Sequence, residues 1–288
     1  MRTYSNKPIM SPPDCNKLNV ILDIDETLVY FINKKYWKHS WDLLSDEEKA
    51  KYTVKPNNSG VFIIRPHLQK FLSFLFKHCN VSLWTLSDEE YAEGVAKMFV
   101  SSKSPRQSER KSPHQSPHRK HKLQHILNGD EHAELAGDLH GNNKDLNWLW
   151  YHSGYDCFAE CNTILIDDLP ANSINPSNRQ NSITINPFAL FGEVKDRSKP
   201  YLDVSEDDTL LKIIELLKIV MKQQHNCAEG DGRWDNIFSE DSIEKMGLES
   251  YLHSMTFRGK RIKSICVGDM NHMGGRRKAK AAHRKAKP

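Results

Sequence analysis

Residues 22–29 read Leu-Asp-Ile-Asp-Glu-Thr-Leu-Val, and they are the most informative stretch of the chain. The apolar run Leu18–Leu22, broken only by Asn19, predicts a buried strand of a parallel sheet that ends at Asp23 and Asp25. In open α/β sheets, ligands bind at the carboxyl ends of the strands. Two acids placed there lower the stability of the fold unless a cation or a substrate compensates their charge. Taken alone, the stretch fits a surface turn with helix-capping aspartates equally well.

Two later strands are also predicted to end in polar residues. The strands expected at 81–84 and 163–166 lead into these residues: Thr85, Ser87, Asp167 and Asp168. A helical pattern follows each strand, and Ser87 is the expected N-cap of the second helix. Because a helix follows each strand, the strands should be parallel and joined by right-handed crossovers. The carboxyl ends of parallel strands lie at the same edge of the sheet, so these polar residues should converge. With a fourth strand at 182–185, the chain is predicted to be an α/β protein with a central parallel sheet flanked by helices.

The residues at these strand ends predict phosphoryl-transfer chemistry. Four carboxylates in one crevice would repel one another, and several would hold protons unless a cation were present. Mg²⁺ is the cation expected where oxygen ligands and phosphate share a site. Lys144 adds a positive charge, and Thr85 offers a hydroxyl near a helix N-terminus, where anions bind. The alternatives are an ordinary exposed lysine, and aspartates that simply terminate a strand.

Five motifs follow one another along the chain: D-x-D-x-T at 23–27, R-P at 65–66, W-T-x-S at 84–87 with a tyrosine at 91, K-D-L at 144–146 and I-D-D-x-P at 166–170. Their order resembles the haloacid dehalogenase superfamily, and within it the RNA polymerase II C-terminal-domain (CTD) phosphatases, especially the small ones. The resemblance implies a Rossmann-like core with a small flap-like insertion after the first strand.

The resemblance also implies a role for each matching acid. Asp23 would be the nucleophile that forms an aspartyl phosphate, and Asp25 would be the general acid and then the general base. Mg²⁺ would lie on the Asp23 carboxylate, the Asp25 backbone carbonyl and Asp168, with Asp167 in support. Small CTD phosphatases usually have Asp-Asn at the last pair, so the Asp-Asp of this chain adds one negative charge.

The remaining matched residues would contact the substrate or its phosphate. Thr85 would bind the phosphoryl group, and Lys144 would neutralise the charge of the nucleophile and the phosphate. Thr27 and Ser87 are expected as secondary contacts. Tyr91 lies where the family has a substrate-facing tyrosine, with packing within its helix as the alternative.

Other segments flank or interrupt the phosphatase domain expected at 17–223. They are an irregular arm at 1–16, a flap-like insertion at 30–60, a disordered Ser-Pro segment at 102–123, a partly helical extension at 224–270 and a disordered basic tail at 271–288. The segments 102–123 and 271–288 each carry seven Lys or Arg residues, so the remaining chain is acidic. The tail would be a nuclear address, a nucleic-acid contact or a solvated end. Apolar residues between Ile243 and Met255 predict an amphipathic helix.

Composition also indicates the cellular compartment of the protein. No run of about 18 apolar residues is present, which argues against a membrane span. The first residues lack the apolar core of a signal peptide. The six cysteines form no C-x-x-C pair, so reduced thiols are expected. These features predict an intracellular protein, nuclear or cytoplasmic, that is not secreted.

Three functions remain open. The first is a Mg²⁺-dependent phosphatase for phosphoserine or phosphothreonine in proteins, such as an RNA polymerase II tail. The second is a phosphatase of the same fold that acts on nucleic-acid 3′-phosphates or small phosphoesters, which the basic segments would favour. The third is a non-catalytic phosphopeptide-binding relative, which the presence of all the motif residues disfavours.

Overall fold

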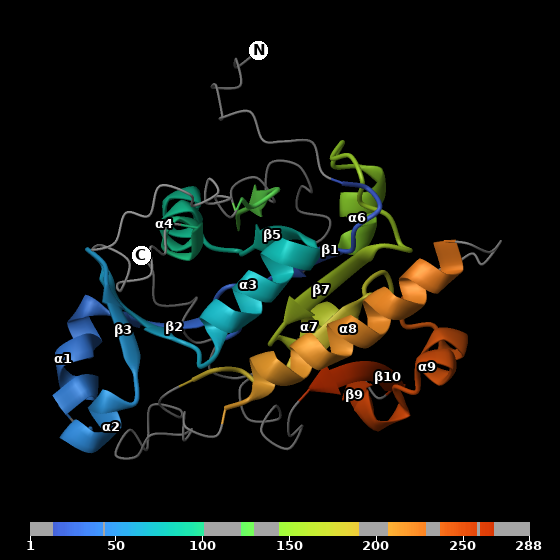
Figure 1. The fold of residues 1–288 in the computed structure, drawn as a ribbon. Helices are drawn as coiled ribbons and strands as arrows, with labels where there is room; N and C mark the ends of the chain where they lie inside the picture. The colour runs from blue at the N-terminus through green and yellow to red at the C-terminus, as the bar shows by residue number, and fades with distance from the viewer. Residues whose placement is uncertain are drawn as a thin grey trace, which may run out of the picture.

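The computed structural model describes residues 14–42, 44–100, 122–129, 144–189, 207–228, 237–257 and 260–267. The predicted Ser-Pro segment up to residue 121, the basic tail and the first 13 residues lie outside these ranges. The fold is α/β, as predicted, with a large central sheet and a small second sheet (Figure 1).

The central sheet has seven strands. In spatial order they are β6 (Ile126–Leu127), β5 (Asn80–Trp84), β1 (Asn19–Leu22), β7 (Thr163–Asp167), β8 (Ser182–Ile185), β10 (Lys260–Val267) and β9 (Leu252–Phe257). Neighbouring strands pair in parallel except β9, which is antiparallel to β10. The strand at the sequence motif, β1, is therefore flanked on both sides by parallel partners, which places three carboxyl ends side by side.

Helices cover both faces of the central sheet. They are α3 (Leu68–His78), α4 (Glu89–Val100), α6 (Leu146–Tyr151), α7 (Pro170–Ser173), α8 (Thr209–Ala228) and α9 (Glu240–Met246), followed by a 3₁₀ turn, η3 (Glu249–Tyr251). Figure 1 shows α3 and α8 lying across one face of the sheet. Side chains alternate along β1, so Val20 and Leu22 join the core under α3 and α8, whereas Ile21 joins a separate core with α6.

The insertion after β1 forms the small sheet. Its strands, in the order β2 (Val29–Asn33), β4 (Gly60–Ile64) and β3 (Thr53–Pro56), are antiparallel, and α1 (Lys34–Asp42) and α2 (Asp46–Ala50) connect β2 to β3. The insertion packs around a small core that it shares with Phe188, and against this core Trp37 and Trp41 stack with ring centroids 4.4 Å apart. This packing explains the aromatic content of the segment.

The C-terminal part of the chain differs from the prediction. The helix expected through Met255 is wrong, because α9 ends at Met246 and Leu252 begins β9. Pairing of β10 with β8 then extends the central sheet by two strands. The physical reason is that the open edge of β8 offers unpaired backbone groups, which a strand satisfies and a helix does not.

The prediction that all the thiols are reduced is also wrong. Cys15 and Cys157 form a disulfide, with their Cα atoms 4.8 Å apart. Cys15 precedes β1 and Cys157 precedes β7, so the pairing of these two strands brings the cysteines together at the amino end of the sheet. None of the helices that the structure describes is long and apolar enough to cross a bilayer.

Candidate active site

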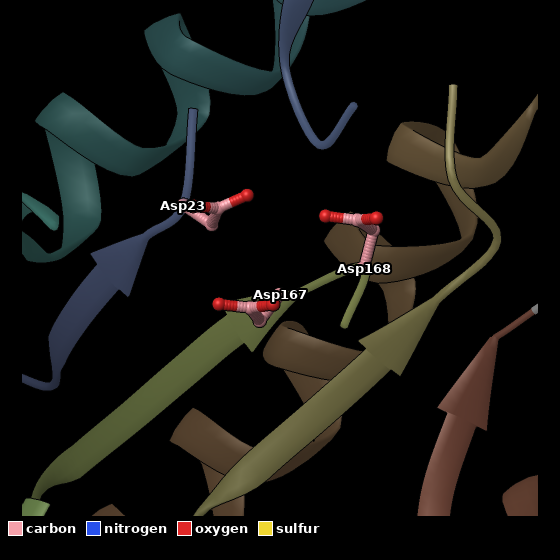
Figure 2. A group of neighbouring side chains, drawn as sticks. All are labelled: Asp23, Asp167 and Asp168. Carbon is pink, nitrogen blue, oxygen red and sulfur yellow. The ribbon is translucent and has the colours of Figure 1, made fainter. Parts of the chain in front are cut away.

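Three aspartates meet at the carboxyl edge of the central sheet, as Figure 2 shows. Asp23 follows β1, whereas Asp167 and Asp168 lie at the end of β7, and the register pairs Leu22 with Ile166. One carboxylate oxygen from each aspartate lies within 4.8 Å of the other two. All three residues are buried, and the most exposed of them, Asp23, is 8% exposed. The three are thus oxygen donors close enough to share one hard divalent cation, as Mg²⁺ requires.

Lys144 supplies the positive charge of the cluster. Its Nζ lies 2.5 Å from Asp23 Oδ1 and 2.7 Å from Asp167 Oδ2. Burial opposes the charge on Lys144, but the two carboxylates outweigh it and raise the pKa of the ammonium group above its ordinary value. The lysine is 1% exposed, so the alternative of an ordinary surface lysine is wrong. One ammonium against three carboxylates leaves negative charge that a cation would balance.

Asp167 and Asp168 have different surroundings although they are adjacent in sequence. Asp167 accepts hydrogen bonds from Lys144, from Asn172 Nδ2 at 2.9 Å and from the Leu169 amide at 2.7 Å. Burial raises the pKa of Asp167, and the charge of Lys144 opposes that rise. Asp168 instead faces Thr27. Asp167 is therefore a partner of the lysine, and Asp168 is bound by Thr27 within the same cluster.

Thr27 joins the two acidic segments. Its Oγ1 donates to Asp23 Oδ2 at 3.0 Å and accepts a hydrogen bond from the Asp168 amide at 3.1 Å. Asp23 Oδ1 is held by Lys144 and its Oδ2 by Thr27, so the orientation of this carboxylate is fixed through both oxygens. The structure therefore places Thr27 within the cluster.

Asp25 belongs to a second group of side chains beside the cluster. The Tyr91 hydroxyl donates to Asp25 Oδ1, and Ser87 Oγ lies 3.5 Å from Asp25 Oδ2. Burial and then the charge of Asp25 raise the pKa of Tyr91, so the hydroxyl keeps its proton. The ring of Tyr91 packs against Phe31 and Phe62 of the small sheet, with centroids 5.9 and 5.7 Å away. Tyr91 thus contacts both an acid of the motif and the insertion.

Thr85 lies directly after β5, at the same edge of the sheet as the aspartates. It is 1% exposed, its amide donates to Leu127 O, and its Oγ1 accepts a hydrogen bond from the Ser87 amide at 3.1 Å. The prediction that Ser87 caps α4 is wrong, because Asp88 Oδ1 accepts the Tyr91 amide at 2.9 Å in that role. The hydroxyl of Ser87 is directed toward Asp25 instead.

The structure adds residues that the motifs did not predict. Asn172 and Asn178 bind the backbone of Lys144, and Arg65 donates from Nη1 to Thr27 O at 3.0 Å. The sequence held a weak signal for the asparagines, because 172, 175, 178 and 181 are all Asn. The arginine was visible as part of R-P, but nothing in the sequence showed that its side chain is directed inward.

Comparisons with known proteins show the family of the chain. The family model described as NLI interacting factor-like phosphatase matches residues 18–228. Protein 355R of Invertebrate iridescent virus 6, named as CTD phosphatase-like, is 28% identical over 175 residues, which cover 59% of this chain and 85% of the viral protein. The ubiquitin-like domain-containing CTD phosphatase 1 of Gallus gallus is 24% identical over 234 residues, which cover 81% of this chain and 58% of that protein.

Among solved structures, the chain is similar to the fission yeast RNA polymerase II CTD phosphatase Fcp1 bound to beryllium fluoride. The match has a TM-score of 0.41 at 18% identity, and it covers 82% of this chain and 64% of that one. The chain therefore spans less than two thirds of Fcp1 and of the Gallus gallus protein.

Proposed function

This chain belongs to the family of NLI interacting factor-like phosphatases, and we propose that it is a Mg²⁺-dependent phosphatase that acts on phosphoserine or phosphothreonine through an aspartyl phosphate. The observation that carries the proposal is the Lys144 ammonium between Asp23 and Asp167, with an oxygen of Asp168 within 4.8 Å of oxygens of both aspartates. A buried lysine that neutralises a carboxylate nucleophile, beside a site for a divalent cation, fits the transfer of a phosphoryl group.

The chemistry begins at the Asp23 carboxylate. One of its oxygens attacks the phosphorus of the substrate, and the bond from phosphorus to the serine or threonine oxygen breaks. Asp25 gives its proton to that leaving oxygen, and the product alcohol departs. A water molecule then attacks the phosphorus of the aspartyl phosphate while Asp25 takes a proton from it. The bond between Asp23 and phosphorus breaks, which releases inorganic phosphate and restores both acids.

The other side chains orient the reacting groups. Lys144 and Thr27 fix the two oxygens of Asp23, so the nucleophile needs little reorganisation before it attacks. Mg²⁺, when bound on Asp23, Asp168 and the backbone carbonyl of Asp25, would neutralise charge on the phosphoryl oxygens. Thr85, which follows β5, would contact the phosphoryl group. Tyr91 and Ser87 hold Asp25 in the resting enzyme.

A phosphorylated protein is the proposed substrate. The viral and Gallus gallus relatives are named as CTD phosphatase-like or CTD phosphatases, which supports a phosphorylated tail such as that of RNA polymerase II and hence an activity in the nucleus. The small sheet supports a peptide rather than a small phosphoester, because its Phe31 and Phe62 reach Tyr91 beside Asp25. Residues that flank the phosphorylated side chain would pass over this surface.

The test is turnover of p-nitrophenyl phosphate and of a phosphoserine peptide by the purified chain, with Mg²⁺ or with EDTA. We expect hydrolysis that requires Mg²⁺, and at least a 100-fold loss in Asp23→Asn. Asp241→Asn is the matched control, because Asp241 is exposed on α9 and lies outside the site. Unchanged turnover in Asp23→Asn, or full activity in EDTA, would contradict the proposal.

The substrate class is tested by comparing the phosphopeptide with a 3′-phosphorylated oligonucleotide over a series of salt concentrations. We expect kcat/KM to be higher for the peptide and to change little with salt. Preference for the oligonucleotide, with a steep loss of rate at high salt, would instead indicate a nucleic-acid phosphatase. Tight peptide binding without release of phosphate would indicate a binding module.

A further inference from the structure

The position of Lys144 does not come from a helix or a strand. α6 begins two residues later at Leu146, with Asp145 as its N-cap. The backbone of a residue in such a segment has to find hydrogen-bond partners elsewhere when it is buried, and Lys144 is 1% exposed. What holds this backbone therefore decides where the ammonium group lies.

Asn172, on α7, binds both the backbone of Lys144 and the carboxylate of Asp167 with one side chain. Its Oδ1 accepts a hydrogen bond from the Lys144 amide at 3.2 Å. Its Nδ2 donates to Asp167 Oδ2 at 2.9 Å, and the same oxygen lies 2.7 Å from Lys144 Nζ. Asn172 is 1% exposed, so water does not compete for these bonds. The two halves of one amide thus fix the main chain of the lysine relative to the carboxylate that its side chain must reach.

Asn178 holds the other side of the same backbone. Its Nδ2 donates to Lys144 O at 2.6 Å and to Asn172 O at 2.8 Å, and its Oδ1 accepts from the Leu146 amide at 2.8 Å. Asn178 is fully buried. The amide and the carbonyl of Lys144 are therefore both bound by asparagine side chains from the segment that follows Asp167.

We propose that Asn172 and Asn178 are positioning residues that hold the Lys144 ammonium between Asp23 and Asp167, and this inference rests on the proposed function. Loss of either amide leaves a buried backbone group of Lys144 without that partner, which allows the backbone to move. A displacement of about 1 Å at a reacting group can lower a rate by roughly 100-fold. The asparagines would therefore act on the reaction through Lys144 and not through contact with the substrate.

The first test is a double-mutant cycle on turnover of p-nitrophenyl phosphate at saturating Mg²⁺. We expect Asn172→Ala and Asn178→Ala each to lower kcat at least tenfold, with KM changed less than twofold. In a Lys144→Met background the same substitutions should lower the remaining kcat less than twofold, because the group through which they act is gone. Equal losses in both backgrounds would overturn the proposal.

Asn181 provides a matched control. It is a fully buried asparagine of the same segment, and its Nδ2 donates to the carbonyls of Glu160 and Thr163 without reaching Lys144. Asn181→Ala should lower the melting temperature about as much as the other two substitutions while leaving kcat unchanged. A fall in kcat in this variant as large as in Asn172→Ala would show that the effect is a general loss of structure.

A second measurement reads the position of the lysine without using activity. In ¹⁵N-labelled protein, the Lys144 ammonium signal is assigned by its loss in Lys144→Met, and its hydrogen exchange is measured. Asn172→Ser is a milder variant that keeps a short hydroxyl group but removes the Nδ2 group that donates to Asp167. We expect exchange at least tenfold faster in this variant and unchanged in Asn181→Ala.

The two measurements separate this proposal from the proposed function. Unchanged exchange in Asn172→Ser would overturn the positioning role, whatever the activity of the enzyme. If the native chain hydrolyses no phosphoester but the exchange is faster in Asn172→Ser, the phosphatase function fails and the placement of the lysine by these asparagines stands.

Discussion

The ion pair between Arg65 and Asp207 should be among the costliest contacts to break in this chain. Arg65 Nε lies 2.9 Å from Asp207 Oδ2, and the two residues are 2% and 7% exposed. The guanidinium group also donates to Thr27 O and to Asn186 O, each at 3.0 Å. Burial lowers the pKa of Arg65, and the charge of Asp207 opposes that change. Because arginine stays protonated in proteins, Asp207 is the carboxylate that compensates its charge in the core.

Asp207→Asn removes the charge and keeps the size of the side chain. Removing one partner of a buried pair costs about 3–5 kcal/mol, because the other charge is left uncompensated. We expect the lower end, about 3 kcal/mol, because the asparagine can still accept a hydrogen bond from the arginine. With a dependence on urea of about 2–3 kcal/mol per molar, the midpoint of unfolding should fall by about 1–1.5 M.

The assay is urea unfolding followed by tryptophan fluorescence. Asp208→Asn is the matched control, because Asp208 is the next residue and pairs with Lys212 on the surface, where the two side chains are 51% and 54% exposed. An exposed pair of this kind contributes less than about 0.5 kcal/mol. If Asp207→Asn lowers the midpoint no more than Asp208→Asn does, the buried pair does not hold these segments together and the reasoning is refuted.

Four further predictions follow from other parts of the structure. Gly60→Ala should destabilise the small sheet by about 2 kcal/mol or more, because a Cβ there would lie 2.2 Å from Ile32 O, whereas Gly94→Ala in α4, with open space around it, should raise the melting temperature. Cys15→Ser should lower the free energy of unfolding by about 2–5 kcal/mol through loss of a cross-link between residues 142 apart, and Cys161→Ser, at an exposed thiol, should change it by less than about 0.5 kcal/mol. Burial raises the pKa of the Cys266 thiol from 9.0 to about 12, so the contribution of this thiol to stability is complete below pH 9 and is lost as the pH rises toward 12. Iodoacetamide at pH 8 should therefore modify the exposed Cys161 before the buried Cys266, as mass spectrometry would show. Asp168→Asn should raise the Mg²⁺ concentration needed for half-maximal turnover, whereas Asp167→Asn should lower kcat even at saturating Mg²⁺. The reverse pattern would contradict the different partners of the two acids.

Much of the central sheet could be predicted because apolar runs that end in polar residues report buried parallel strands directly. β1, β5, β7 and β8 lie where these runs are, and their bounds shift by a few residues at most. Neither β9 nor β10 was predicted. Leu252 and Met255 are spaced as they would be on a helix. This segment forms a strand because β10, with which it pairs, adds to the open edge of β8. That edge exists only once the rest of the sheet has formed.

Contacts between distant segments were the least accessible to prediction. The spacing of the cysteines gave no sign of the bond between Cys15 and Cys157, because it arises from the pairing of β1 with β7. The same holds for Arg65, whose partner Asp207 is 142 residues away. Patterns of a few residues report local structure, whereas these pairs depend on the register and order of strands, which a single sequence specifies only through the complete fold.

The adjacent acids Asp167 and Asp168 show that the site, too, was predictable in its residues but not in their contacts. The sequence predicts that two carboxylates stand at the end of β7, but it assigns them no separate partners. Asp167 binds Lys144 and Asn172, whereas Asp168 contacts Thr27, although both carboxylates belong to the same cluster. The additional negative charge of an Asp-Asp pair would then be that of Asp168, within the cluster that includes Asp23, where a cation would balance it. We expect that an asparagine at 168 would supply an oxygen ligand without that charge and change the affinity for the cation, while the pairing of Lys144 with Asp167 stays the same.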